Sequence, residues 1–187
     1  MTLPADPASD AEGGRAQTLT AALIARLLAG SSATAVLETW CAERGLSEAG
    51  LGAERIPGPE KPLGAAQRQR LALAARETVR HRRVRLVCGA HILSLADNWY
   101  VPGRLTPAMN RSLDATRVPF GRVVHALAPT RRTLAVRLRW STPVAPGADE
   151  PLFSVSALLA TPDGVPFCEV EETYLGAVLR LSRDGAA

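Results

Sequence analysis

The first quarter of the chain places apolar side chains at the spacing of an α-helix. Leucine and isoleucine recur every three or four residues up to Gly30, at Leu19, Leu23, Ile24, Leu27 and Leu28. This spacing predicts an amphipathic helix that stops at the glycine. Ser31 and Ser32 are residues that cap helix N-termini, and a second apolar stripe follows them as far as Gly45. The sequence therefore predicts two helices before residue 46.

The segment 46–64 interrupts this periodicity. It contains three prolines and several glycines, a composition typical of a loop that crosses the surface. Helical spacing returns after it. We therefore expect a third helix from Ala65 to about His81.

From residue 82 onward the period changes to that of β-strands. Val84, Leu86 and Cys88 fall at every second position, and a turn at 89–91 leads into a second apolar run, which predicts a β-hairpin. A short helix is expected over 106–113, and a short turn or helix is expected to begin at 119–121. Three further strands are expected over 134–138, 152–160 and 165–175. Helices first and strands afterwards predict an α+β fold, a single domain with an antiparallel β-sheet flanked by helices.

Length and composition fit one globular domain. The 187 residues are 47% hydrophobic but only 4% aromatic, which indicates a core filled mainly by Ala, Leu and Val. The N-terminus carries acids and prolines where a secretion signal would be basic and then apolar. We expect a disordered tail over 1–14 and the folded domain over 15–187. The cysteines do not have the spacing of disulfide or zinc pairs, which favours a reducing cytoplasm. No apolar run is long enough to span a membrane.

The net charge of +4 comes largely from dispersed arginines, without aromatic interleaving or a basic tail. We therefore expect no nucleic acid partner, since a small organic anion would use the same charge. Nucleotide-binding loops, nucleophile elbows and zinc-protease motifs do not occur in the sequence, and His81, His91 and His125 are isolated from one another. No metal and no cofactor are expected.

Two of the predicted strands place a single charged residue on an otherwise apolar face. In the last strand Glu172 shares its side with Val170 and Tyr174, because side chains alternate between the two faces of a sheet. Arg82 holds the matching position beside Val84 in the first strand of the hairpin. A buried charge without a partner is costly. Arg82 and Glu172 are therefore expected either to form a structural salt bridge or to bind a ligand.

Four short segments resemble the chorismate lyase family in their order and spacing. They are RRVRLVCG at 82–89, ADNWYVP at 96–102, VPFGR at 118–122 and EETYL at 171–175. The segment LLAGSSAT at 27–34 resembles the family's first pocket-lining segment more loosely. The resemblance implies a single-domain antiparallel sheet flanked by helices. It also implies cleavage of chorismate to 4-hydroxybenzoate and pyruvate without any cofactor.

The resemblance also implies roles for individual residues. By position, Arg82 resembles the arginine that grips the substrate carboxylate, and Glu172 resembles the glutamate that meets the ring hydroxyl. A desolvated Glu172 with a raised pKa would act as general acid near the departing oxygen. Phe120 lies in the turn whose backbone groups the family uses. Ala33 falls where a bulkier residue lines the family's pocket, which predicts a pocket of different size.

The register of these two assignments is open by one residue. A shift by one position would give the same roles to Arg83 and Glu171. We prefer Arg82 and Glu172, because only this register keeps their inward neighbours apolar and places Tyr174 on the same face.

The residues leave three hypotheses for function. The first is a chorismate lyase-like enzyme acting on chorismate or a similar anionic aromatic compound. The second is a non-catalytic, sensor-type domain of the same fold that binds a small molecule. The third is a structural domain in which Arg82 and Glu172 merely pair. For the first two we expect a small anionic aromatic or cyclohexadiene ligand, and a monomer or weak dimer in the cytoplasm.

Overall fold

The structure is a computed structural model that describes residues 7–181, with side chains from residue 11 onward. Its elements in chain order are α1 (Pro7–Ala29), α2 (Ala33–Glu43), β1 (Leu51–Arg55), α3 (Ala65–Arg70), β2 (Arg80–Cys88), β3 (His91–Tyr100), α4 (Pro107–Ala115), α5 (Phe120–Val123), β4 (Thr130–Leu138), β5 (Pro151–Ala160) and β6 (Pro166–Leu175). Three short 3-10 helices are η1 (Pro102–Arg104), η2 (His125–Leu127) and η3 (Gly176–Leu179).

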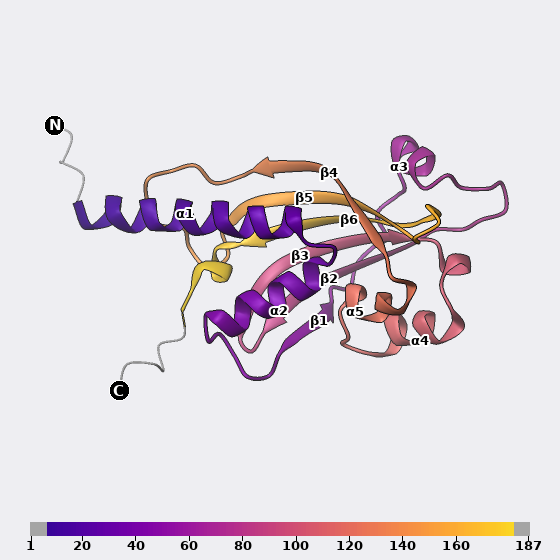
Figure 1. Ribbon diagram of the computed structural model, residues 1–187, viewed down its shortest axis with the longest axis horizontal. Coiled ribbons are helices and arrows are strands. Elements are labelled where there is room, and N and C mark those ends of the chain that lie inside the picture. The colour runs from indigo at the N-terminus through magenta and orange to yellow at the C-terminus, as the bar shows by residue number, and fades with distance from the viewer. Residues whose placement is uncertain (1–6, 182–187) are drawn as a thin grey trace.

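The six strands form one sheet in the order β1-β2-β3-β6-β5-β4, and every neighbouring pair is antiparallel. Helices α1 and α2 lie along one face of this sheet (Figure 1). The expected α+β fold with an antiparallel sheet is therefore confirmed. The two strands of the predicted hairpin, β2 and β3, lie next to each other as expected.

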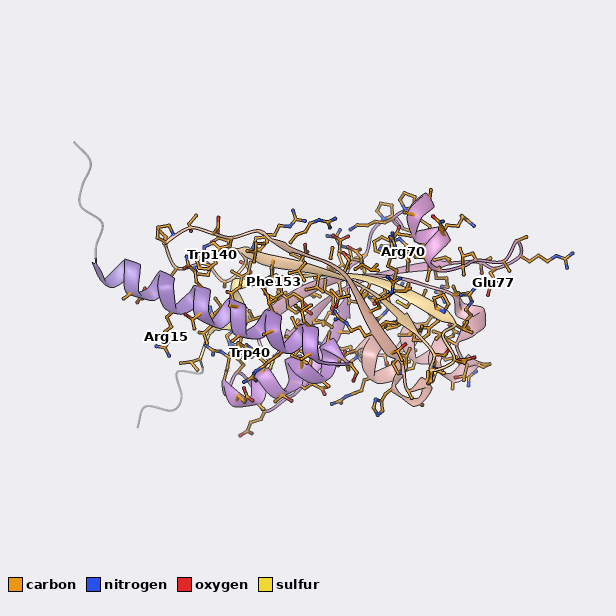
Figure 2. All side chains as sticks on the ribbon, turned by 45° about the horizontal axis from the view of Figure 1, so that its top comes forward. Arg15, Trp40, Arg70, Glu77, Trp140 and Phe153 are labelled. Carbon is orange, nitrogen blue, oxygen red and sulfur yellow. The ribbon has the colours of Figure 1, made fainter. Side chains whose placement is uncertain are left out.

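Two hydrophobic clusters cover the inner face of the sheet. The first, here the α1–α2 cluster, joins both helices to the strands and includes Leu23, Leu27, Leu37, Trp40, Val84, Leu86, Val155 and Tyr174. Trp40, Trp140 and Phe153 of this cluster gather around α1 (Figure 2). The second, the α4–α5 cluster, consists of Tyr100, Leu105, Leu113, Phe120, Val124, Leu159, Phe167 and Cys168. The inner face therefore has two separate apolar centres, one at each end.

The start of the chain differs from the expected tail over 1–14. Helix α1 begins at Pro7, so residues 7–14 are helical, while residues 1–6 lie outside the described part. Proline is favoured at a first helical position, where its missing N–H costs no hydrogen bond. Gly13 fits because α1 runs close to the loop between β4 and β5: a Cβ on Gly13 would lie 1.5 Å from the Pro143 carbonyl oxygen. The absence of a side chain at Gly13 is therefore a packing requirement.

The segment 46–64 is not entirely a loop, because it contains β1. Leu51 and Ala53 are buried, and the strand pairs with β2 from Leu51 opposite Cys88 to Arg55 opposite Val84. A strand of five residues with alternate burial is too short for its period to stand out among the glycines and prolines. The strand β1 is therefore determined by its pairing with β2 and not by a local sequence pattern.

The third helix is much shorter than expected, because α3 ends at Arg70. The end of the predicted helix, Arg80 and His81, belongs to β2 and pairs with Tyr100 and Trp99. Arginine and histidine are compatible with either state, so tertiary pairing decides between them.

Candidate functional site

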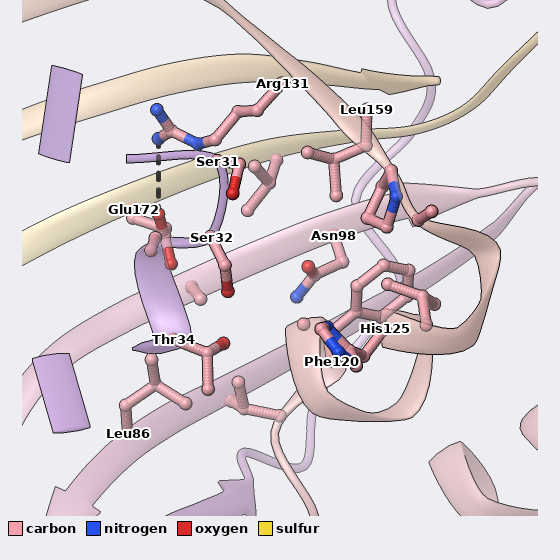
Figure 3. A pocket seen from close by; sticks show the side chains of 18 residues that line it. Ser31, Ser32, Thr34, Leu86, Asn98, Phe120, His125, Arg131, Leu159 and Glu172 are labelled. Carbon is pink, nitrogen blue, oxygen red and sulfur yellow. Dashed lines mark ion pairs between the residues drawn. The ribbon is translucent and has the colours of Figure 1, made fainter. Parts of the chain in front are cut away.

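A cavity of about 270 Å³ lies on the inner face of the sheet, between the two hydrophobic clusters (Figure 3). Strands β2, β3, β4, β5 and β6, the α1–α2 turn, and the segment from α5 to the start of β4 contribute to its wall. The lining residues are Ser31, Ser32, Ala33, Thr34, Val84, Leu86, Ala96, Asn98, Phe120, Gly121, Val124, His125, Ala128, Pro129, Arg131, Leu159, Val170 and Glu172.

Most of the cavity floor is apolar. Val84 and Leu86 of β2, Ala96 of β3, Val170 of β6 and Leu159 of β5 present aliphatic side chains to it. They do so because inward positions alternate along each strand. Such a surface suits the ring or hydrocarbon part of a small molecule.

Two of the predicted site residues, Ala33 and Phe120, each stand at the first position of a helix in the cavity wall. Ala33 opens α2, whose N-terminus is capped by the Ser32 hydroxyl accepting from Ala35 N–H at 3.3 Å. Phe120 opens α5 and is buried against Tyr100, with ring centroids 5.7 Å apart. Both predicted residues therefore belong to the cavity wall.

The two helix starts approach closely at a glycine. A Cβ on Gly121 would lie 2.5 Å from the Thr34 hydroxyl oxygen. The absence of a side chain at this position lets α5 pack on the beginning of α2. The contact closes one side of the cavity.

Glu172 lies at one end of the cavity and is only 6% exposed. The Tyr174 hydroxyl donates a hydrogen bond to Glu172 Oε2 at 3.0 Å, and Arg131 Nη2 lies 3.8 Å from the same oxygen. Burial raises the pKa of the Glu172 carboxyl, while the Arg131 charge and the Tyr174 hydrogen bond oppose this with smaller effects. The buried carboxyl is therefore biased towards its neutral form.

Arg82 is also buried on the inner face, at 2% exposure. Its Nε, Nη1 and Nη2 atoms have no hydrogen-bond partner within residues 7–181. Burial lowers the pKa of the guanidinium and the nearby charge of Arg55 lowers it further, while Tyr100 and Asp114 oppose this with smaller effects. A guanidinium has five N–H donors and remains charged. Within the described residues Arg82 is therefore a buried cation that forms no hydrogen bond with a counter-charge.

Asn98 sits directly opposite Arg82 in the β2–β3 pair and lines the cavity. Its side-chain Nδ2 is buried and has no partner in the described structure either. Arg82 itself does not line the cavity; it lies beside Asn98 on the same face. Together the two side chains form a group of unsatisfied donors, which we call the Arg82–Asn98 donor group.

Arg82 and Glu172 do not pair with each other. Arg82 is opposite Asn98, and Glu172 is opposite Ala96. Their Cα atoms are therefore separated by two strand spacings of about 4.8 Å each and, along the strands, by two residues with a rise of about 3.4 Å each. Together these place the two Cα atoms about 12 Å apart. The expected alternative of a structural Arg82–Glu172 salt bridge is wrong, because the cation beside Glu172 is Arg131.

The alternative register places its residues on the outer face. Arg83 is exposed, with its Nε 3.8 Å from Asp97 Oδ1, and Glu171 is only partly buried. The inward positions belong to Arg82 and Glu172, as the alternation indicated. The roles proposed for these two residues remain predictions.

Several cavity residues were not expected from the sequence. Arg131 stands in a strand rich in arginine, and nothing in its spacing separates it from its exposed neighbour Arg132. Asn98 carries no charge that would mark it. His125 is isolated from the other histidines in the sequence and is exposed, but it stands in the cavity wall. These three residues are recognised as part of the site only from the tertiary structure, which places them in the cavity wall.

A second polar cluster, formed by Lys61, His81, Asp97 and Trp99, lies on the outer face. The His81 ring accepts from Lys61 N–H at Nδ1 and contacts Asp97 Oδ1 through Nε2 at 2.8 Å. Nδ1 is therefore the acceptor nitrogen and Nε2 carries the proton. Trp99 donates to the Lys61 carbonyl at 3.2 Å. Both ring nitrogens are engaged, so the cluster anchors the 56–64 loop to the sheet.

Comparison with known proteins places the chain among relatives. No protein-family model matches the sequence. The chain is 40% identical over 175 residues to the uncharacterized protein y4mC of Sinorhizobium fredii (strain NBRC 101917 / NGR234), across 84% of this chain and 73% of y4mC. The chain belongs to the y4mC family.

Solved structures relate this y4mC-family protein to known folds. PhnF from Mycobacterium smegmatis matches with a TM-score of 0.50 and 12% identity, over 71% of this chain. The chain spans only 60% of the length of PhnF. A GntR-family transcriptional regulator from Enterococcus faecalis V583 matches with a TM-score of 0.47 and 10% identity, over 70% of this chain and 97% of that one.

At such identities the likeness shows the fold alone. The y4mC-family protein has the chorismate lyase-like α+β fold of GntR-type effector domains. The fold implied by the resemblance to chorismate lyase is therefore confirmed.

Two further findings concern the described residues. No helix between residues 7 and 181 has the length and apolar character needed to cross a membrane. Within the same range, no three His, Cys, Asp or Glu side chains come together as a metal site.

Proposed function

We propose that this protein reversibly binds a small organic anion in the cavity and acts as a sensor-type, non-catalytic domain. The observation that carries the proposal is the Arg82–Asn98 donor group, in which four buried nitrogen atoms lack partners in the described structure. Buried donors are normally satisfied, and a buried charge without a counter-charge is strongly unfavourable. A carboxylate is the acceptor that satisfies both requirements, since arginine binds it with two parallel hydrogen bonds.

The rest of the cavity supports a ligand with a compact apolar body. Its volume of about 270 Å³ and its aliphatic floor suit a single ring. We infer a small aromatic or cyclohexadiene carboxylate, whose carboxylate meets the Arg82–Asn98 donor group. Glu172 at the other end would face a hydroxyl or a similar polar substituent.

Calorimetric titration with 4-hydroxybenzoate tests the proposal. We expect saturable 1:1 binding that Arg82→Gln reduces by at least about ten-fold, because a charge-assisted bond to the carboxylate is lost. The matched control is Arg83→Gln, which removes a neighbouring charge from the outer face and is expected to leave binding unchanged. Equal affinities of wild-type protein and Arg82→Gln would contradict the proposed site.

Catalysis of the chorismate lyase type is the second candidate, and the environment of Glu172 favours it. In that reaction the ring C–O bond to the enolpyruvyl group breaks, and a ring hydrogen moves to the enolpyruvyl carbon. The products are 4-hydroxybenzoate and pyruvate, so no co-reactant is needed. Burial raises the pKa of Glu172, and a neutral carboxyl near the departing oxygen would act as general acid. Arg82 would hold the ring carboxylate.

Incubation with chorismate separates the two candidates. Formation of both products, lost in Glu172→Gln and retained in Glu171→Gln, would establish the lyase. Binding of 4-hydroxybenzoate without product formation from chorismate would support the sensor-type domain. The fold decides neither, since one fold serves many functions.

A further inference from the structure

Arg131 presents an unsatisfied donor at the end of the cavity that Glu172 occupies. Its Nη1 donates to the Leu27 carbonyl at 3.2 Å and to the Thr133 hydroxyl at 3.1 Å. These bonds fix the guanidinium between α1 and β4. Its Nη2 is buried and has no hydrogen-bond partner among the residues described, and the side chain is only 3% exposed. Arg131 is therefore held rigidly with one donor left open.

Glu172 does not satisfy this donor. The 3.8 Å between Arg131 Nη2 and Glu172 Oε2 is longer than a hydrogen bond, and Oε2 already accepts from the Tyr174 hydroxyl. Figure 3 shows the pair at one end of the cavity, with Phe120 and His125 towards the other end and Asn98 between them. The carboxyl offsets the arginine charge only from a distance.

The two open cationic positions lie on the same face with an apolar floor between them. The Arg82–Asn98 donor group stands at one position, and Arg131 stands at the other. We propose that Arg131 binds a second anionic group of the ligand, so that the cavity prefers small dicarboxylates to monocarboxylates. The inference rests on the proposed function, because it assumes that the first carboxylate meets Arg82.

The positions of the open donors favour this assignment. Two arginines face or flank the cavity, and Glu172 is the acidic side chain in its lining. A monoanion can form hydrogen bonds with only one of the two guanidinium groups. A dianion places one carboxylate against each guanidinium, and both contacts are charge-assisted hydrogen bonds. Burial already raises the pKa of the Glu172 carboxyl, and a carboxylate bound beside it would favour its neutral form further.

Benzoate and terephthalate, its 1,4-dicarboxylate, form a matched pair of probes, and isophthalate tests the spacing of the second carboxylate. In calorimetric titrations we expect one of the dicarboxylates to bind wild-type protein about ten-fold or more tightly than benzoate. In Arg131→Gln this preference should vanish while benzoate affinity is kept. Arg82→Gln should weaken all three probes. Arg132→Gln is the matched control, because Arg132 is exposed on the same strand.

The outcomes separate this inference from the proposed function. Arg82-dependent binding of all probes with equal affinity would leave the anion site standing and overturn the role of Arg131. A dicarboxylate preference that survives in Arg131→Gln would overturn it as well. Failure of every probe to bind wild-type protein would contradict both. If Arg131→Gln does not fold, the probes are compared in wild-type protein and in Arg131→Lys, which keeps the charge. Equal affinities of these proteins for benzoate and for the dicarboxylates would overturn the proposal.

Discussion

Arg82 is the residue at which stability and binding conflict. Its guanidinium is removed from solvent without gaining a partner within the described chain. Under the proposed function, an anion that binds Arg82 would recover the free energy that this burial costs. A protein that kept the position for stability alone would place an apolar residue there, because its neighbours on the inner face are apolar.

Arg82→Met is expected to stabilise the unliganded protein by about 1–3 kcal/mol, because it replaces an uncompensated cation with an apolar side chain of similar length. Chemical denaturation of the two proteins measures the change in the free energy of unfolding. Arg83→Met, at the exposed neighbouring position, serves as the control and should change stability little. A clear loss of stability in Arg82→Met would show that the guanidinium has partners after all.

At the scale of elements, the contact between α5 and α2 shapes the cavity. Gly121→Ala should destabilise the protein by about 1–3 kcal/mol, because the added methyl group would meet Thr34 at 2.5–3.1 Å and force the helices apart. Thermal unfolding measures the effect. Gly103→Ala is the control, since a Cβ there has no atom within 4 Å. Equal unfolding temperatures of the two variants would contradict this packing.

The end of the 65–79 segment is held by an ion pair between Glu77 and Arg104. Arg104 Nε donates to Glu77 Oε1 at 2.7 Å, and the Arg104 hydrogen bond lowers the pKa of Glu77 to about 2. A depressed carboxyl pKa contributes stability above about pH 4.3, its unfolded value, that is lost as the pH falls towards 2. Wild-type protein should therefore lose more stability over this range than Glu77→Gln. Parallel pH profiles in denaturant titrations would contradict the assignment.

The sequence patterns correctly predicted those parts of the fold that are determined by local alternation or spacing of apolar residues. The inward positions of Arg82 and Glu172 follow from period-two burial in β2 and β6. The strand β1 and the early end of α3 depend on pairing with distant segments, which no local pattern contains. Arg131 joins the site because β4 brings it next to the buried Glu172 of β6. The partner of a buried charge is a property of the tertiary fold.

For the whole molecule, ligand binding and stability are linked. A ligand that binds only the folded state, at 100 times its dissociation constant, adds about 2.7 kcal/mol. For a domain of this size that corresponds to a rise of about 5–10 °C in Tm. We expect such a shift with 4-hydroxybenzoate in wild-type protein and a clearly smaller one in Arg82→Met, because the variant lacks the arginine contact to the carboxylate. Scanning calorimetry with and without the ligand makes the comparison, and an equal shift in both proteins would place binding elsewhere.

A crystal structure of the protein with 4-hydroxybenzoate would test the central claim most directly, because it locates the carboxylate. We predict that the ring lies on the aliphatic floor, with the carboxylate within hydrogen-bond distance of Arg82 or Asn98 and the hydroxyl towards Glu172. A ligand bound outside the cavity, or a carboxylate directed to solvent while the Arg82 guanidinium stays unpartnered, would contradict the account.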